Sequence, residues 1–537
     1  MKHYMVIFLL GLTGLIARGQ SITPICSFNN FTNGPERPLG ELTMGPDGNW
    51  YSTSIFGGSN NDGTVFELTT NDVLTTLVSF AGTNGANPYA GLTLGPDGSL
   101  YGVAAAGGNN NDGTIFRVTT NGILTTLVEF DSVNGSGPEA ALTLGPDGNF
   151  YGTTKFGGPL SRIVGGRGDG TVFQMMTNGT LTTLVTFTNV NGALPDGSLT
   201  VGPDGNLYGT TSEGGGPGSG AGYGTVFRMT TNGVFTRLAV FNANGEIGPN
   251  AGLTLGPDNN FYGTTEAEGG SVSNGTIFMV TTNGVLTSIF TFDGTNGTGS
   301  EGNLALGPDG NLYGTTSGGG SNDDGTVFKI TTNGLLTTLA NFNGTNGDGP
   351  AAGLTLGPDG NFYGTTGNGG SGGNGVVYRL DLPPEFLEAP TSQSIVIGNG
   401  ATLNATAFGT VPFSYQWLSN GVPIDEATNS QLAIEEFVTN TQYQVVISNI
   451  YGNATSSVAT LTAVAATPAV SLDANGDVIL SLATSTNFES RLYMATNLTP
   501  PVVWQSIYTN VGGGIWQFTD TNAAAMNSGR FYLLSTP

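Results

Sequence analysis

Short runs of apolar residues alternate with polar turns along most of this chain, and the alternation repeats about every 50 residues. Within residues 90–130, four apolar runs of strand length occur in the order Gly91–Leu94, Leu100–Val103, Gly113–Thr119 and Leu124–Phe130. The turn at residues 95–98, Gly-Pro-Asp-Gly, combines a proline that presets φ with a glycine that accepts positive φ, and Asn121-Gly122 is a strong hairpin signal. The pattern predicts four antiparallel strands.

The same unit occurs seven times, and we number the copies repeat 1 to repeat 7 in chain order. Their Gly-Pro-Asp turns open at Gly45, Gly95, Gly145, Gly202, Gly256, Gly307 and Gly357, at intervals of 50, 50, 57, 54, 51 and 50 residues. A fixed period of this length is typical of propellers, solenoids and arrays. Four antiparallel strands in each repeat favour the blade of a β-propeller.

The two ends of the array predict a closed ring. Repeat 7 ends at Val376–Leu380 without a fourth strand, whereas Ile22–Phe28 aligns with Leu74–Phe80, the fourth strand of repeat 1. We therefore expect the N-terminal strand to pair beside Val376–Leu380, because closure removes exposed sheet edges and a solenoid would need capping units instead. Residues 20–381 are predicted to form an all-β, seven-bladed β-propeller closed by the N-terminal strand.

Three phrases recur in the same order in the repeats: Gly-Pro-Asp-Gly-Asn-Leu-Tyr-Gly-Thr-Thr, a Gly-Gly loop, and Gly-Thr-Val-Phe. Together they resemble the "GloVer" tandem repeat of exported bacterial proteins, over roughly residues 22–381. The resemblance implies an exported bacterial protein whose repeats are joined to a surface-attaching end. It brings no catalytic residue.

Residues 389–464 resemble an immunoglobulin-like domain. Ala401–Ala405, Tyr415–Gly421 and Tyr443–Asn449 are similar to three of its strands, which implies a core Trp417 and a tyrosine-corner Tyr443. Ala405 and Val445 stand where that family has its two cysteines, so the usual disulfide is absent. Leu382–Glu388 is interpreted as a linker, and residues 468–537 are predicted to form a small C-terminal, β-sandwich-like module.

The first 19 residues have the pattern of a signal peptide. Lys2 is followed by an apolar run from Val6 to Ala17 and by a cleavage site at Ala17-Arg18-Gly19. We therefore expect a secreted or cell-surface protein, and no other apolar run is long enough to predict a transmembrane protein. Removing residues 1–19 leaves 11 basic and 38 acidic residues, a formal charge of 11 − 38 = −27. Such a charge argues against nucleic acid and anionic lipid as partners.

Several catalytic and metal-binding classes are excluded by composition. The chain has one histidine, His3, which lies in the signal, and one cysteine, Cys26, which aligns with Val78 of a strand and is expected to be a core residue. Ser-His-Asp, Cys-His and His-ligated zinc sites are therefore not predicted. The aspartates of the repeated turns are interpreted as turn chemistry. We predict no cofactor and no metal, although calcium binding by the Asn/Asp loops stays open.

The departures from the repeat provide the candidate binding residues. Most repeats place four residues between Gly-Gly and Gly-Thr, but repeat 3 places eleven (Pro159–Asp169) and repeat 4 eight (Gly216–Tyr223). In a propeller these loops share a face with the links between blades. The candidate ligand-binding residues on this rim are Arg162, Arg167, Tyr223, Glu213, Glu266 and Glu268. Drift in tolerant surface loops is the alternative interpretation.

The function expected from these observations is that of an exported, non-catalytic binding or adhesion protein. Its propeller face would recognise an extracellular glycan or surface protein, and the two C-terminal modules would act as spacer and attachment. One alternative is a glycan hydrolase or lyase that uses Glu213 with Glu266 or Glu268 as paired carboxylates. Another is a purely structural surface component. The sequence does not determine the oligomeric state.

Overall fold

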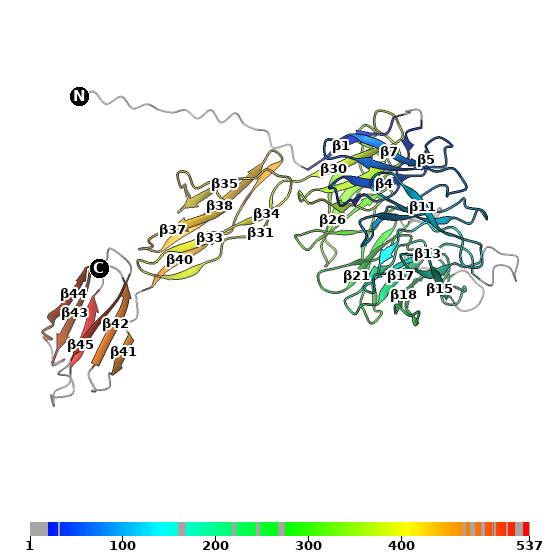
Figure 1. Ribbon diagram of the computed structural model, residues 1–537. Helices are drawn as coiled ribbons and strands as arrows, with labels where there is room; N and C mark the ends of the chain where they lie inside the picture. The colour runs from blue at the N-terminus through cyan, green and yellow to red at the C-terminus, as the bar shows by residue number, and fades with distance from the viewer. Residues whose placement is uncertain are drawn as a thin grey trace, which may run out of the picture. The chain divides into compact units, whose positions relative to one another are not determined.

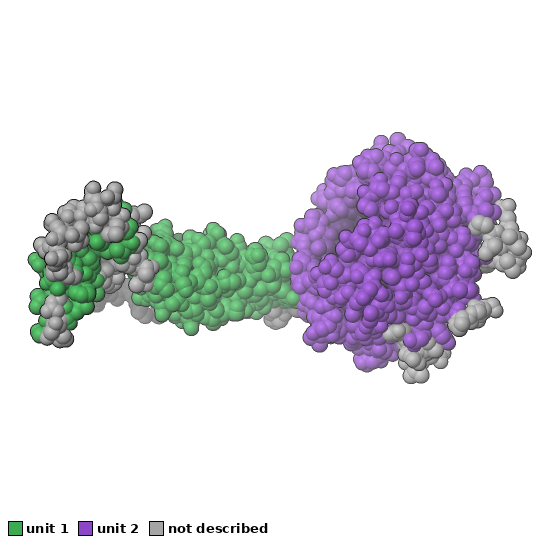
Figure 2. All heavy atoms as spheres, turned by 90° about the horizontal axis from the view of Figure 1, so that it is seen from below, with its two compact units in different colours: residues 1–17, 383–537 green, residues 18–382 purple. Residues whose placement is uncertain are grey.

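The computed structural model describes residues 20–29, 33–158, 168–216, 222–242, 248–266, 274–464, 469–472, 478–484, 489–496, 498, 501–511, 514–520 and 530–535. All regular secondary structure in these ranges is β-strand. The described residues form two compact units, and the chain passes from one to the other between Leu382 and Pro383 (Figure 2).

Seven four-stranded antiparallel sheets make up the described part of the first unit. Repeats 1 to 3 form β3 (Thr43–Met44), β4 (Trp50–Ser54), β6 (Thr64–Leu68) and β7 (Leu74–Ser79); β8 (Thr93–Leu94), β9 (Leu100–Ala104), β10 (Thr114–Val118) and β11 (Leu124–Glu129); and β12 (Thr143–Leu144), β13 (Phe150–Thr154), β14 (Thr171–Met175) and β15 (Leu181–Thr186). A short pair, β2 (Pro35–Glu36) and β5 (Phe56–Gly57), lies beside repeat 1.

Repeats 4 to 6 follow the same order. They form β16 (Thr200–Val201), β17 (Leu207–Thr211), β18 (Thr225–Met229) and β19 (Phe235–Val240); β20 (Thr254–Leu255), β21 (Phe261–Thr265), β22 (Thr276–Val280) and β23 (Leu286–Thr291); and β24 (Ala305–Leu306), β25 (Leu312–Thr316), β26 (Thr326–Ile330) and β27 (Leu336–Asn341). Repeat 7 contributes β28 (Thr355–Leu356), β29 (Phe362–Thr366) and β30 (Val376–Asp381), and β1 (Ser21–Ser27) is the fourth strand of that sheet. The arrangement is all-β and β-propeller-like.

The strand pairing predicted from the two ends of the array is present. β1 runs antiparallel to β30, with Ser21 opposite Asp381, Cys26 opposite Val377 and Ser27 opposite Val376 (Figure 1). Cys26 packs against a core that contains Val377, in agreement with its predicted role as a small core residue. The N-terminal strand therefore covers the edge that β30 would otherwise expose.

One hydrogen bond joins successive repeats and also joins the last repeat to the first. In six of the seven repeats, a threonine at the start of the two-residue strand donates to a leucine carbonyl of the next repeat, as in Thr93 to Leu142 and Thr143 to Leu199; repeat 6 has Ala305 at this position. Thr355 of repeat 7 makes the same bond to Leu42 of repeat 1, at 2.8 Å. Trp50 and Tyr363 likewise stack across these two repeats, with ring centroids 4.9 Å apart.

The repeated turn explains why each sheet keeps its geometry. The turn aspartate accepts a hydrogen bond from the hydroxyl of the tyrosine four residues later in every repeat, and the pairs are Asp47–Tyr51, Asp97–Tyr101, Asp147–Tyr151, Asp204–Tyr208, Asp258–Tyr262, Asp309–Tyr313 and Asp359–Tyr363. The tyrosine rings pack into the core, and six of the seven are fully buried. The predicted turn chemistry of the aspartates is confirmed.

The second unit begins with three sheets, one of six strands and two of two strands, that share one core. Its strands are β31 (Glu385–Glu388), β32 (Gln393–Val396), β33 (Ala401–Asn404), β34 (Thr406–Phe408), β35 (Ser414–Ser419), β36 (Val422–Pro423), β37 (Gln431–Ile434), β38 (Thr441–Asn449), β39 (Gly452–Thr455) and β40 (Ala459–Val464). Trp417, Ala405, Tyr443 and Val445 are all buried in this core. β31 pairs with β34, so the stretch predicted as a linker contains a strand of this unit.

The remaining strands form two three-stranded sheets. They are β41 (Ala469–Leu472), β42 (Val478–Thr484), β43 (Glu489–Ala495), β44 (Gln505–Val511), β45 (Gly514–Asp520) and β46 (Phe531–Ser535). Leu480 of β42 and Leu492 of β43 pack in one cluster, so the two sheets share a small core.

Candidate functional site

A cavity of about 290 Å³ is lined by residues from all seven repeats. Most of its wall comes from the links that precede the two-residue strands. Backbone bridges such as Ala193 to Glu213 and Thr298 to Gly318 hold each link against the end of the second strand of the same repeat. The lining therefore comes from the link of every repeat, and Lys155 of repeat 3 and Glu266 of repeat 5 are added from the segment after the second strand.

The deepest ring of the cavity uses one position per repeat, the residue before the leucine that leads into the two-residue strand. These residues are Glu41, Gly91, Ala141, Ser198, Gly252, Asn303 and Gly353. The small members allow close approach, since a Cβ on Gly353 would lie 2.4 Å from Oε1 of Glu41. The polar members can therefore meet across the centre.

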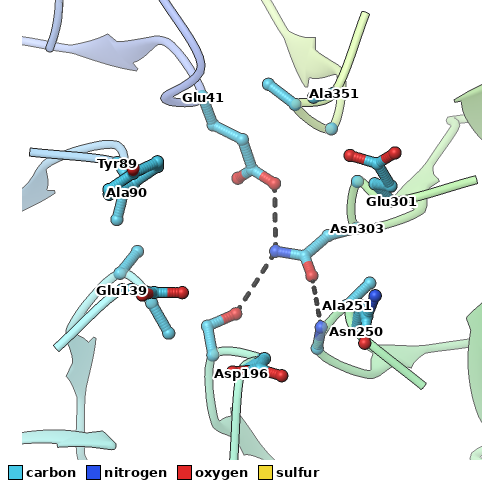
Figure 3. A pocket seen from close by; sticks show the side chains of 18 of the residues that line it. Glu41, Tyr89, Ala90, Glu139, Asp196, Asn250, Ala251, Glu301, Asn303 and Ala351 are labelled. Atoms are coloured by element: carbon cyan, nitrogen blue, oxygen red, sulfur yellow. Dashed lines mark hydrogen bonds between the residues drawn. The ribbon is translucent and has the colours of Figure 1, made fainter. Parts of the chain in front are cut away.

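Asn303 connects four repeats at this centre. Its Nδ2 donates to Oε1 of Glu41 at 2.9 Å and to Oγ of Ser198 at 3.2 Å, and its Oδ1 accepts from the Gly252 amide at 2.7 Å (Figure 3). Loss of water around Glu41 raises the pKa of its carboxyl to about 7, although the hydrogen bonds from Asn303 and the Gly353 amide act in the opposite direction. Glu41 is thus an acid poised near neutral pH.

Above this ring, four consecutive repeats carry a polar pair with the same spacing of 16 residues. Lys155 donates to Glu139, Ser212 to Asp196, Asn250 to Glu266 and Ser317 to Glu301. One member of each pair follows the proline or serine of the link, and the other ends the second strand. We call these four pairs the polar arc.

The corresponding positions of repeats 7, 1 and 2 are apolar or small. The pairs there are Ala351 with Gly367, Leu39 with Ile55, and Tyr89 with Ala105. Leu39, Tyr89 and Ala351 line the cavity, and the Tyr89 side chain is 39% exposed. We call these three residues the apolar arc. The cavity therefore has two chemically distinct sides.

The polar arc is strongly acidic. Burial raises the pKa of the Glu139, Asp196 and Glu301 carboxyls. Lys155 lies 3.1 Å from Glu139 and 3.2 Å from Asp196, and this contact with two carboxylates raises its pKa despite desolvation. Glu266 adds to the pKa rise of Glu301. The described lining includes five carboxylates and a single basic side chain.

Of the six candidate residues predicted from the sequence, one lines the cavity, two do not, and three lie outside the described residues. Glu266 lines the cavity. Glu213 is exposed beside Ser212 and does not line the cavity, while Tyr223 packs against the core formed by Tyr208 and neighbouring apolar residues. Arg162, Arg167 and Glu268 lie outside the described residues.

The sequence analysis missed most of the cavity wall, although a signal was present. The link reads Pro-x-small-x-Leu in six repeats, and the first x is Leu39, Tyr89, Glu139, Asp196, Asn250 or Ala351; repeat 6 has Ser300 in place of the proline and Glu301 at the x position. A position that varies inside an otherwise constant phrase indicates a surface that the repeats do not need for packing. Comparing the repeats position by position, rather than by loop length, would have identified it.

Among the described residues, no three His, Cys, Asp or Glu side chains are grouped closely enough to hold a metal ion. In the same part of the chain, no helix has the length and hydropathy needed to cross a membrane.

The fold and the cavity define an all-β tandem-repeat protein with β-propeller-like sheets. The sequence pattern of the Gloeobacter/Verrucomicrobia repeat matches residues 15–221, 160–269 and 217–389. These matches span more than half of the chain, which therefore belongs to that repeat family, as its resemblance to the "GloVer" repeat predicted. No curated protein matches the chain.

The chain has low sequence identity to several solved structures. The structure of "a putative 6-phosphogluconolactonase from Bacteroides uniformis" is 17% identical, over 58% of this chain and 88% of that one, with a TM-score of 0.40. A chimeric titin Z1Z2 structure is 22% identical over 16% of this chain and 97% of that one, with a TM-score of 0.14. The I67–I69 fragment of titin is 14% identical over 29% of this chain and 64% of that one, with a TM-score of 0.16.

Proposed function

We propose that the chain is an exported, non-catalytic binding protein that holds an extracellular glycan or a surface protein at its central cavity. The observation that carries this proposal is the origin of the lining, since all seven repeats contribute to one cavity. A concave site with a few convergent polar groups is the usual form of a ligand pocket. The repeat phrase is nearly constant, whereas the lining differs from repeat to repeat.

In this proposal the first unit is a seven-bladed β-propeller closed by its N-terminal strand. Pairing of β1 with β30 supports closure, as does the hydrogen bond from Thr355 to Leu42. The stacking of Trp50 on Tyr363 repeats the contact made by Tyr101 on Phe150 between adjacent blades. The junction between repeats 7 and 1 therefore has contacts of the same kind as junctions between repeats that are consecutive in the chain.

Binding rather than catalysis is favoured by how the polar side chains are held. Each acid of the polar arc is fixed by a partner 16 residues away in the same repeat, so the wall is preorganised. The chain has a single histidine, His3, which lies outside the described residues, and a single cysteine, Cys26, which packs against a core cluster away from the cavity lining.

Residues 1–19 would direct export, which places the protein in the secreted or cell-surface fraction. Residues 389–464 would form an immunoglobulin-like domain, since Trp417 is buried in a core with Ala405 and Val445 in the positions of the missing cysteines. This domain and the C-terminal module would act as spacer and attachment.

The test is a binding screen with the full mature chain and a variant whose cavity is filled. Ala351→Trp adds bulk to the apolar arc without changing a charge, and Ala81→Trp adds the same bulk at an exposed position outside the cavity. We expect a ligand from an array of bacterial-surface glycans and proteins to bind the wild type and Ala81→Trp, and to lose at least about tenfold in affinity for Ala351→Trp, because its site is occupied. Equal binding by all three proteins would place the site elsewhere.

One observation favours a second function, carboxylate-dependent glycan cleavage. Glu41 has a pKa of about 7 and lies at the floor of an acidic cavity, as a general acid would. Release of reducing sugar from a bound glycan, abolished by Glu41→Gln, would establish an enzyme. If the glycan binds and no reducing sugar is released, binding without cleavage is the function.

A further inference from the structure

The chemistry of the cavity wall specifies a class of ligand, and this inference rests on the proposed binding function. Each donor side chain of the polar arc already makes at least one bond to a carboxylate of the arc. The hydroxyls of Ser212 and Ser317 donate to Asp196 and Glu301, and the amide of Asn250 donates to Glu266. Lys155 is shared by Glu139 and Asp196.

At the centre of the cavity, the side-chain donors of Asn303 are also bonded to neighbouring residues. Nδ2 of Asn303 donates to both Glu41 and Ser198, so this amide group directs its hydrogen atoms at the wall rather than at the space. A ligand that needs donors, such as a phosphate or a sulfate, would have to displace these internal bonds.

In contrast, carboxylate oxygens of the lining can still accept further hydrogen bonds. A carboxylate has about four lone-pair sites, and Glu266 and Glu301 each accept the hydrogen bond of their partner through a single oxygen. Oδ1 of Asp196 is buried and forms an ion pair with the Lys155 ammonium at 3.2 Å. The unused acceptor sites of Glu266 and Glu301 therefore favour a ligand that brings N–H or O–H groups.

The net charge of the lining restricts the class of ligand further. The lining carries Glu41, Glu139, Asp196, Glu266 and Glu301 against Lys155 alone. An anionic ligand would add repulsion, whereas a cation would lower the energy of carboxylates that have lost much of their hydration. Among the described residues no three acids are grouped as metal ligands. The distributed acids therefore suit a larger, organic cation better than a bare metal ion.

The apolar arc suits the carbon skeleton of such a cation. Leu39 and Ala351 present aliphatic surface, and the exposed ring of Tyr89 offers a face for cation–π contact. We propose that the cavity binds an ammonium or guanidinium group on an aliphatic stem, with the charged end at the polar arc and the stem on the apolar arc. Lysine and arginine side chains of a polypeptide and free polyamines share this chemistry.

Calorimetric titration of the full mature chain tests the proposal, with two probes for the two sources. One is the capped peptide Gly-Gly-Arg-Gly-Gly, compared with the same peptide containing citrulline, which is the same shape without the charge. The other is agmatine, a free guanidinium-bearing amine. We expect the arginine peptide, agmatine or both to bind, and the citrulline peptide to bind at least about tenfold more weakly, because bonds to charged groups are the stronger ones.

The variants Glu266→Gln and Glu301→Gln should each weaken cation binding by about fivefold or more, whereas Glu435→Gln, an exposed acid of the second unit, should not change it. Glu213→Gln separates the cavity from the rim predicted by the sequence, and binding should be unaffected. Melting curves show whether each variant is folded. Equal affinity for arginine and citrulline peptides, or no cation binding at all, would overturn the proposal.

The two proposals fail in distinguishable ways. If a neutral or anionic ligand binds the wild type and is lost in Ala351→Trp, the cavity is a binding site and the cation inference is wrong. If Ala351→Trp does not change the affinity for any ligand of the wild type, the proposed function itself is wrong.

Discussion

Asn303 donates a hydrogen bond to Glu41 at 2.9 Å, although the two residues are 262 positions apart in the sequence. They occupy the same position of repeats 6 and 1, where three other repeats have glycine. The wide separation in sequence and the short distance in space show that repeats 1 and 6 meet at one cavity. This contact links the packing of the first unit directly to its candidate binding site.

Removing the Asn303 side chain should destabilise the first unit. Asn303→Ala deletes the bonds to Glu41, Ser198 and Gly252, and it leaves a carboxylate without its side-chain donor. We expect a loss of about 2 kcal/mol or more in unfolding free energy, since hydrogen bonds to charged groups contribute about 1.5–3 kcal/mol each. Scanning calorimetry of the full chain measures it. Asn250→Ala, which removes a bond at the more exposed Glu266, should cost less, and equal costs would contradict the central role of Asn303.

The raised pKa of Glu41 predicts how stability depends on pH. Between its ordinary value of 4.5 and about 7, the folded protein keeps the proton that the unfolded chain releases. The folded state then binds more protons, so the free energy of unfolding falls as pH rises through this interval. Glu139, Asp196 and Glu301 shift in the same direction and add to the effect.

Glu41→Gln should therefore flatten the fall in stability between pH 4.5 and pH 7 and raise stability at pH 8, by an amount on the order of 1–3 kcal/mol. Denaturation at several pH values provides the measurement. Glu435→Gln, at an exposed site of the second unit, is the control. A profile for Glu41→Gln that parallels the wild type would show that Glu41 ionises normally.

The aspartate of the repeated turn should contribute to stability through its tyrosine. Asp258 accepts bonds from the Asn260 amide groups and from the buried Tyr262 hydroxyl at 2.8 Å. Asp258→Ala leaves that hydroxyl without its acceptor, and we expect a loss of about 1–3 kcal/mol. Asp258→Asn keeps an acceptor oxygen in the turn and should cost clearly less. If both variants lose the same amount, charge rather than hydrogen bonding stabilises the turn.

Much of the repeat architecture was predictable because each repeat is locally consistent. The proline, aspartate and glycine of the turn set its backbone, and the alternation after it gives strands such as β9 (Leu100–Ala104) within one residue of the prediction. The length of the innermost strand was overestimated. Gly91–Leu94 was predicted, but only Thr93–Leu94 pairs, because Gly91 leaves the sheet to line the cavity.

The candidate site was much less predictable. Glu139 and Lys155, or Ser317 and Glu301, look like isolated substitutions in a single repeat, and their meaning appears only when the links are superimposed around one centre. The sequence emphasised the long loops because insertions are easy to see. Of the residues chosen on that basis, Glu266 alone lines the described cavity, through its place at the end of β21 rather than through a loop insertion.

The pairing of β1 with β30 offers a covalent test of ring closure. Cys26 lies opposite Val377 in the antiparallel register, and both side chains belong to one core cluster. Directly opposed residues of antiparallel strands have Cα atoms about 4.5–5.5 Å apart, within the range that a disulfide bridges. Val377→Cys should therefore form a bond with Cys26 on mild oxidation, visible by mass spectrometry of the digested chain. The bond would close a loop of roughly 350 residues and should raise the unfolding free energy by about 2–5 kcal/mol, minus any strain.

Val65→Cys, at the equivalent site of repeat 1 opposite Val78, is the control and should leave Cys26 free. A Val377→Cys chain that stays reduced under oxidant, or that cross-links between molecules instead, would contradict closure by the N-terminal strand.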